Sequence, residues 1–282
     1  IILRAKLLWY IGLLIILIFW NGGLLLMRIL LTNDDGIHAR GIQALVAELS
    51  KIAEIYMVAP DRERSATGHS ITVFEPIKAT QTNFAGVAKA WIVGGTPVDC
   101  VKLAMSKLVK DIDLVVSGIN HGPNLGTDVL YSGTVSAAAE GVIMGAPAIA
   151  VSLDSYDADM EFNFAAKFTR TVVETVMQHE IDKSTLININ IPFNRKERIK
   201  GIRVTKLGVR NYDNLFEERY DPRGNTYYWL GGGVRDEKQE AGSDVEAVQD
   251  GYISITPINL DLTDYDLINE YQEAFVDYLE WK

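Results

Sequence analysis

The stretch ILLTNDDG, residues 29–36, places a short apolar run directly before a polar turn. Runs of this length rich in branched apolar residues are typical of a buried strand, and the Asn-Asp-Asp-Gly that follows favours a tight turn at its end. Apolar residues then recur with helical spacing from Ile42 to Leu49, which predicts an amphipathic helix over residues 41–50. A strand, a turn and a helix in this order predict the start of a βαβ unit.

The same alternation continues along the chain. Further helical periods begin near residues 98, 132 and 165, between apolar runs that favour strands. Strands that are apolar throughout are typical of a parallel sheet covered by helices on both faces. We therefore predict an α/β fold with a mostly parallel sheet. The predicted strands are Arg28–Thr32, Glu54–Ala59, Leu114–Val116, Ala148–Ser152 and Leu186–Ile191.

The pattern changes after Lys206, where polar, aromatic and glycine-containing sequence replaces the alternation. We interpret this region as an extended arm or hairpin. Its aromatic cluster at residues 227–229 (YYW) would either cover the domain's own core or contact another subunit. A strand at residues 252–257 and an amphipathic helix over residues 268–279 are predicted to follow.

The composition limits the classes of function. The chain has 282 residues, with 27 Lys and Arg against 37 Asp and Glu, for a formal charge of −10, and 48% of its residues are hydrophobic. This content suffices for a sizeable core, whereas the acidic balance disfavours binding to a nucleic-acid polymer through its phosphates. The single cysteine, Cys100, excludes an internal disulfide.

The first 26 residues form a separate hydrophobic segment. Leu7–Trp20 is apolar, but this run is shorter than the roughly 20 residues needed to span a bilayer, and no small-x-small cleavage site follows it. Met27 stands directly before the first strand. We predict that the native protein starts at Met27 and is cytoplasmic, with a membrane anchor through residues 1–26 as the alternative. The catalytic core would then span residues 27–206, and the arm, closing strand and helix residues 207–282.

Oxygen-bearing side chains follow three of the predicted strands. Asp34 and Asp35 come after the first strand, Ser65 lies in the turn after the second, and Asn120 follows the strand that begins at Leu114. The carboxyl ends of parallel strands meet at one rim of the sheet, so we expect these groups to converge. Two carboxylates, a hydroxyl and an amide are hard donors that suit Mg²⁺ or Mn²⁺. The alternative is that an aspartate merely caps the following helix.

Two glycine-containing segments could bind a phosphate group. In residues 94–99 (GGTPVD), Thr96 can cap a helix with Asp99 as its partner, while Gly95 lets backbone N–H groups approach an anion. In residues 131–134 (YSGT), Ser132 opens an alanine-rich helix. Each segment is also explained as an ordinary helix start.

Other known signatures are absent or weak in this sequence. There is no P-loop and no Gly-x-Gly-x-x-Gly, which disfavours a nicotinamide enzyme, and no Gly-x-Ser-x-Gly nucleophile elbow. His38, His69 and His121 lie in or beside the strand-end loops. Each could be a general acid, a substrate contact or a solvated loop residue.

The combination of motifs resembles the SurE survival proteins, which are metal-dependent 5'/3'-nucleotidases. The resemblance runs from Met27 nearly to the carboxyl terminus. It implies a Rossmann-like three-layer core, and an arm exchanged between subunits in a homodimer or homotetramer. The motifs that carry it are ILLTNDDG (29–36), APDRERSATGHS (59–70), GGTPVDC (94–100), VSGINHGPN (116–124) and YSGTVSAAAEG (131–141).

The resemblance also implies a chemistry: hydrolysis of nucleoside 5'- and 3'-monophosphates to nucleoside and phosphate by attack of water. One divalent cation per subunit, Mg²⁺ or Mn²⁺, would be held by Asp34, Asp35, Ser65 and Asn120. Asp34 or Asp35 would orient or deprotonate the water. The predicted substrate-binding residues are Asn33, Gly95, Thr96, Asn124, Ser132, Gly133 and Thr134.

Two other functions stay open. A phosphoaspartyl phosphatase would use one aspartate as a covalent nucleophile, although such enzymes carry an Asp-x-Asp that this sequence lacks at the first strand. A non-catalytic nucleotide-binding stress protein would bind the same ligand without turning it over.

Overall fold

A computed structural model describes residues 27–157, 159–179, 182–193, 199–213, 216–235 and 239–277. The hydrophobic segment 1–26, and with it the predicted anchor, lies outside these ranges, as does the end of the predicted last helix. In the part of the chain that is described, no helix is both long and apolar enough to cross a membrane.

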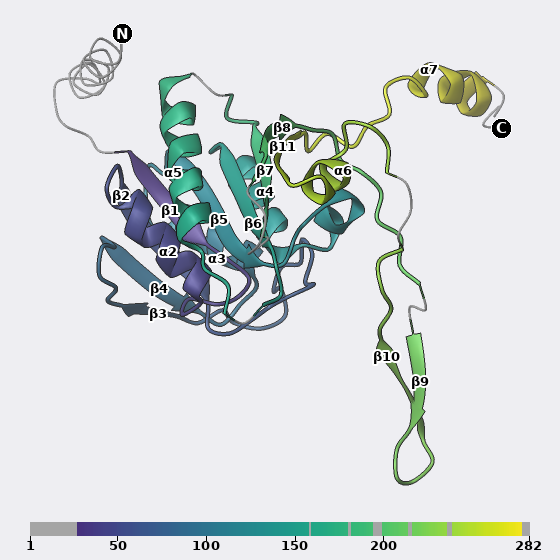
Figure 1. The fold of residues 1–282 in the computed structure, drawn as a ribbon, viewed down its shortest axis with the longest axis horizontal. Coiled ribbons are helices and arrows are strands. Elements are labelled where there is room, and N and C mark those ends of the chain that lie inside the picture. Colours follow the sequence, from purple (N-terminus) through teal and green to yellow (C-terminus); the bar gives the residue numbers. More distant parts are fainter. Residues whose placement is uncertain are drawn as a thin grey trace.

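A nine-stranded sheet forms the centre of the molecule (Figure 1). Its strand order is β3-β4-β2-β1-β5-β6-β7-β11-β8. The strands from β4 to β7 run parallel, whereas β3 and β11 pair antiparallel with their neighbours β4 and β7. The prediction of a mostly parallel sheet is confirmed. The strands are β1 Arg28–Thr32, β2 Glu54–Pro60, β3 Ala79–Thr82, β4 Lys89–Val93, β5 Leu114–His121, β6 Ala148–Asp154, β7 Leu186–Pro192, β8 Gly201–Val204 and β11 Tyr252–Ile258.

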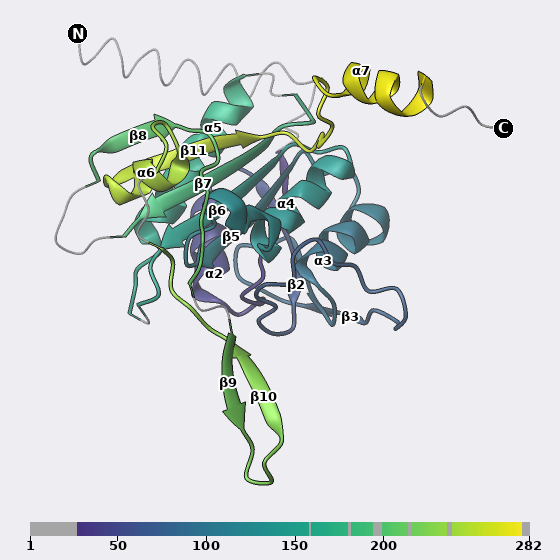
Figure 2. The same ribbon diagram turned by 90° about the vertical axis from the view of Figure 1, so that its right-hand side faces the viewer.

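Helices cover both faces of this sheet (Figures 1 and 2). On one face lie α2 (Arg40–Leu49) and α5 (Asn163–Gln178), which bury their apolar stripes in a core that includes side chains of β1, β2, β5, β6 and β7. On the other lie α3 (Pro97–Leu103), extended by a π-helical turn, and α4 (Gly133–Ile143). The strands have helices on either side, which explains why they are apolar at successive positions.

Strand β5 is longer than the sequence predicted. It continues past Val116 to His121, so residues 117–120 end the strand rather than forming a loop. The pairing of β5 with β6 shifts register between Ser117 and Asn120. Gly118 has φ +132° at this point, and a Cβ there would lie 2.3 Å from the Val151 carbonyl oxygen. Only glycine permits this close approach.

The strand order reverses direction beside β1. From β1 the chain moves outward to β2 and β4, and it then returns to β5 on the other side of β1. In open α/β sheets, ligands bind where the order reverses, beyond the carboxyl ends of the strands. The turn after β1 and the end of β5 therefore flank the expected binding crevice.

The carboxyl-terminal region leaves the sheet and returns to it. Strands β9 (Phe216–Tyr220) and β10 (Thr226–Leu230) form an antiparallel hairpin that projects from the body (Figures 1 and 2). The side chains of residues 227–229 are exposed, so they do not cover the core of this chain. The chain then forms α6 (Asp244–Gln249) and β11, and the last elements of its described part are α7 (Ile268–Tyr271) and a π-helical turn over residues 272–277.

Candidate active site

Asp34 lies buried between the end of β1 and the start of α4. Its side chain is 4% exposed, and its Oδ1 accepts a hydrogen bond from the Thr134 hydroxyl. Gly133 lies against it, since a Cβ at Gly133 would come within 2.9 Å of Asp34 Cβ. The amino end of α4 therefore fixes the carboxylate and places the positive end of a helix dipole beside it.

Both aspartates have raised pKa values. Burial raises the pKa of Asp34, against the lowering effect of the Thr134 hydrogen bond. Burial, followed by the neighbouring charge of Asp34, raises the pKa of Asp35 to about 7. The Glu63 carboxylate contributes to both shifts. A cation between these carboxylates would compensate a repulsion that the protein alone relieves only in part.

The loop after β2 is tied to this turn. The backbone N–H of Arg64 donates to the Asp34 carbonyl oxygen at 2.7 Å. The Ser65 hydroxyl donates to Glu63 Oε1 at 2.7 Å, so in this structure it contacts Glu63 rather than an aspartate. Sequence reasoning missed Glu63. Its signal was a carboxylate in the turn after β2, two positions before the predicted ligand Ser65.

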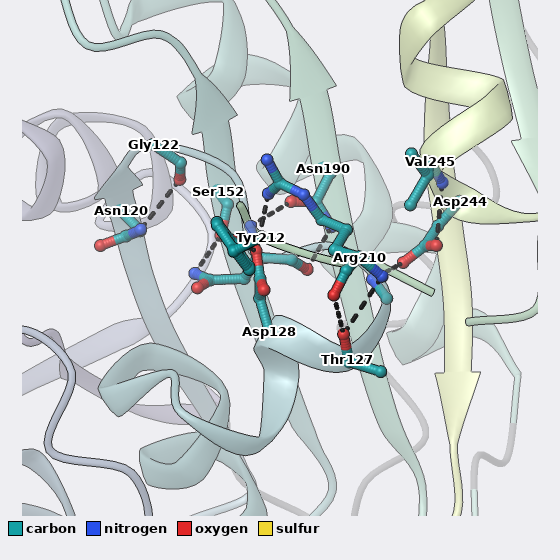
Figure 3. Close-up of polar contacts among 12 residues, drawn as sticks. Asn120, Gly122, Thr127, Asp128, Ser152, Asn190, Arg210, Tyr212, Asp244 and Val245 are labelled. Atoms are coloured by element: carbon teal, nitrogen blue, oxygen red, sulfur yellow. Dashed lines mark hydrogen bonds and ion pairs between the residues drawn. The ribbon is translucent and has the colours of Figure 1, made fainter. Parts of the chain in front are cut away.

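The end of β5 completes the rim. The backbone N–H of His121 donates to Asp35 Oδ2 at 3.3 Å. The Asn120 amide nitrogen donates to the Gly122 carbonyl oxygen at 2.8 Å (Figure 3), which turns its nitrogen toward the loop and leaves Oδ1 for another partner. Contacts of the aspartate pair thus reach both the turn after β2 and the end of β5.

Asn124, a predicted substrate contact, is an internal anchor. Its side-chain amide donates to the Ser152 hydroxyl at 2.8 Å. Its backbone N–H donates to Asn190 Oδ1 at 2.8 Å, and its carbonyl oxygen accepts from the side chains of Asn188 and Asn190. The network fixes the loop that follows β5, since buried polar groups of this kind are costly to separate.

The segment that carries Gly95 and Thr96 forms the predicted helix start. Thr96 caps α3 with Asp99 as the reciprocal partner, which confirms the capping box. The Thr96 hydroxyl also donates to the Ser70 carbonyl oxygen at 2.8 Å. Asp99 accepts from the hydroxyl of Thr72 at 2.6 Å. These hydrogen bonds hold the loop after β2 against α3. The helix cap accounts for the presence of Thr96 and Asp99 without a bound ligand.

Ser132 and Asn33 are the sequence neighbours of Gly133 and Asp34, which lie against each other. The Ser132 hydroxyl accepts from the Val135 backbone N–H at 3.0 Å and so caps α4, as its alternative interpretation predicted. The Asn33 amide donates to the Gly36 carbonyl oxygen at 2.9 Å. Among the described residues, nothing donates to the buried Asn33 Oδ1. Buried acceptors are rarely left without a partner, so this oxygen is a candidate for a ligand contact.

The donors here are those of a hard cation. The described residues include no cluster of three or more His, Cys, Asp or Glu placed to hold a metal ion. A cation beside Asp34 and Asp35 would therefore complete its shell with neutral oxygens and water, an arrangement that suits Mg²⁺ or Mn²⁺.

A cavity of about 240 Å³ opens beside Asp35, between the start of α2 and the segment that precedes α5. Glu63 and His121 contribute to its polar wall, and the buried side chains of Met160 and Phe162 to its apolar wall. A small organic group attached to a ligand at Asp35 could enter this space.

Comparisons with known proteins identify the family of this chain. The family model described as "Survival protein SurE" matches residues 29–214. A protein of Syntrophomonas wolfei named "5'-nucleotidase SurE" is 68% identical over 253 residues, which cover 89% of this chain and 96% of that protein. One of the same name from Heliobacterium modesticaldum is 53% identical over 249 residues, which cover 88% of this chain and 91% of the relative.

A solved structure leads to the same family. The crystal structure of the SurE protein from Aquifex aeolicus superposes with a TM-score of 0.76 at 41% identity, covering 88% of this chain and 99% of that one. The resemblance found in the sequence is confirmed. The family match includes both aspartates, the loop after β2 and the end of β5, and this chain belongs to the SurE survival protein family.

Proposed function

We propose that this protein is a divalent-metal-dependent phosphomonoesterase that hydrolyses nucleoside 5'-monophosphates, and also 3'-monophosphates, to nucleoside and phosphate. The relatives named 5'-nucleotidase SurE support this activity. The observation that carries it is the pair of adjacent carboxylates where the strand order reverses, with Asp34 bonded to the amino end of α4 and Asp35 to the end of β5.

Asp34, Asp35, Ser65 and Asn120 would hold one Mg²⁺ or Mn²⁺ per subunit. When bound, the cation supplies charge neutralisation for a phosphate oxygen and a site that orders water. Ser65 and Asn120 each keep lone pairs after the hydrogen bonds that they donate to Glu63 and Gly122. The donor chemistry of all four residues fits this role.

The remaining steps fall to the protein's own groups. Asp34 is fixed by Thr134, and Asp35 lies beside the cavity, so either carboxylate can orient or deprotonate an attacking water. Backbone N–H groups of residues 132–134 can hold the phosphate at the amino end of α4. Asn33, Gly95, Thr96 and Asn124 complete the proposed substrate set, with Asn124 acting through its fixed loop.

We also propose that the chain forms a homodimer or homotetramer through its region 207–282, distinct from a core over residues 27–206. The exposed aromatic side chains of the hairpin and of the last helix support this, because large apolar groups left in water favour association. The mass in solution, measured by light scattering, tests it.

The function is tested by phosphate release from AMP and GMP, with Mg²⁺, Mn²⁺ or chelator, by the full chain and by a chain that starts at Met27. We expect turnover only with metal, in both forms. Metal-independent turnover, or full activity in Asp35→Ala, would overturn the mechanism. A trapped phosphoenzyme would instead support the phosphoaspartyl mechanism, and nucleotide binding without phosphate release would support the non-catalytic alternative.

A further inference from the structure

An aromatic pair lies directly beside the aspartate site. The rings of His121 and Tyr156 have centroids 6.0 Å apart and are tilted by 48°. The backbone N–H of His121 donates to Asp35. His121 also directly follows the proposed ligand Asn120 in the chain. Tyr156 follows the end of β6, at the same rim of the sheet as the ends of β1 and β5.

Tyr156 is largely exposed to solvent. Its exposed fraction is 74%. It lies on the backbone of Gly122, where a Cβ would come within 2.5 Å of Tyr156 Cε1. Gly122 therefore allows the ring to rest directly on the loop that also accepts the Asn120 amide.

We propose that His121 and Tyr156 form the platform on which the nucleobase of the substrate stacks. This inference rests on the proposed function, because it assumes that the phosphate of a nucleoside monophosphate binds at Asp34 and Asp35. In such a ligand the ribose separates the base from the phosphate. In the structure, the His121 ring lies next to the Tyr156 ring, and the backbone of His121 contacts Asp35.

The chemistry of the platform matches that of its occupant. Nucleobases stack on aromatic side chains with little regard to their identity, because every base has a π-face. The cavity beside Asp35 has His121 in its wall, so the ribose has space between Asp35 and this member of the ring pair. A platform of this kind predicts a preference for nucleotides over other phosphomonoesters and weak discrimination among bases.

The competing explanation is that Tyr156 only covers Gly122 and supports the base of the arm. Arg210 and Tyr212 from the arm contact Asp128, which lies on the same loop (Figure 3). Loss of a purely structural ring would disturb all substrates alike, whereas loss of a stacking ring would penalise only ligands that carry a base.

The test compares AMP with ribose 5-phosphate, which lacks the base. In Tyr156→Ala, we expect the ratio of kcat/KM for AMP to that for ribose 5-phosphate to fall about tenfold, since stacking of one base is worth roughly that factor. Tyr156→Phe should keep the ratio. Tyr156→Leu, which still covers Gly122, should lower it. Tyr265→Ala, which removes a comparably exposed ring beyond β11, serves as control and should not change it.

A binding measurement without metal gives a second readout. Equilibrium dialysis of adenosine in chelator should show a Kd about tenfold higher in Tyr156→Ala than in the unchanged protein. Equal loss of activity on both phosphate esters in the Ala and Leu variants, with unchanged adenosine binding, would overturn the platform and leave the nucleotidase intact. A wild-type protein that releases phosphate from no phosphomonoester would instead overturn the proposed function.

Discussion

The hydroxyl of Thr134 donates a hydrogen bond to the carboxylate of Asp34, although the two residues lie 100 positions apart in the chain. The contact joins the first turn of α4 to the end of β1. It orients Oδ1 of the buried carboxylate, while Oδ2 lies against Gly133 at the start of the same helix. Outer-shell partners of this kind set the orientation of metal-binding side chains.

Removal of this donor should impair turnover more than folding. We expect Thr134→Val to lower kcat/KM by about 10- to 100-fold, because the carboxylate loses its fixed orientation. Thr134→Ser keeps the hydroxyl and should retain most activity. Phosphate release and circular dichroism of both variants check this. An active Thr134→Val variant would show that the hydrogen bond does not position Asp34 for the reaction.

Asp35→Asn should separate stability from activity. The amide removes a charge that burial and Asp34 disfavour, so at pH 8 the metal-free protein should gain about 2 kcal/mol of unfolding free energy. Activity should fall by more than about a hundredfold. Denaturant unfolding in chelator and phosphate release with Mn²⁺ measure the two effects. Asp266→Asn, an exposed aspartate, is the matched control and should change neither.

The raised pKa of Asp35 also predicts a pH dependence. In the folded state the Asp35 carboxyl, with a pKa of about 7, keeps its proton until the pH approaches 7. In the unfolded chain its pKa is the ordinary 3.8, so it loses the proton near pH 3.8. The contribution of protonated Asp35 to the free energy of unfolding is therefore fully present below pH 3.8 and is lost as the pH rises through 7. The free energy of unfolding falls by at most about 1.4 kcal/mol per pH unit from this group.

This dependence is measured as the difference in unfolding free energy between the unchanged protein and Asp35→Asn in chelator, from pH 4.5 to 8. Subtraction cancels the titration of the other groups. The difference should fall with rising pH and level off above 7. A difference that is flat or rises across this window contradicts the assignment.

Gly133→Ala should act on the site through Asp34. The added methyl group would lie 2.9 Å from Asp34 Cβ, closer than side-chain carbons approach, so the carboxylate or the start of α4 must shift. We expect at least about a tenfold loss in kcat/KM. Gly231→Ala adds the same methyl group where nothing lies within 4 Å and should have no effect. Equal activities of the two variants would show that the contact is tolerant.

The sequence predicted the central strands because they are buried on both faces, which leaves uninterrupted apolar runs such as the one at Ile29–Leu31. It missed β3 and β8, whose residues are largely exposed and therefore carry no such run. It also missed β4. It ended β5 too early, because Gly118 and the polar residues around it are typical of a turn.

In the site, residue types were more predictable than their contacts. The spacing of Thr96 and Asp99 indicated a capping box, because both partners lie within one helical turn. No local pattern could show that the Asn124 amide turns inward to Ser152 on another strand. Which atom of a side chain faces a ligand depends on packing between segments that are far apart in the chain. The position of Glu63 beside the aspartates depends on such packing too.

Strand β11 carries a consequence for biosynthesis. It inserts between β7 and β8, so within the described part of the chain β8 has no sheet neighbour other than a segment translated some fifty residues later. Until residue 258 has left the ribosome, the edge of β7 that pairs with β11 stays open to solvent or to a chaperone. The strands from β4 to β7 can therefore assemble during translation, whereas the far edge of the sheet can close only after β11 has emerged.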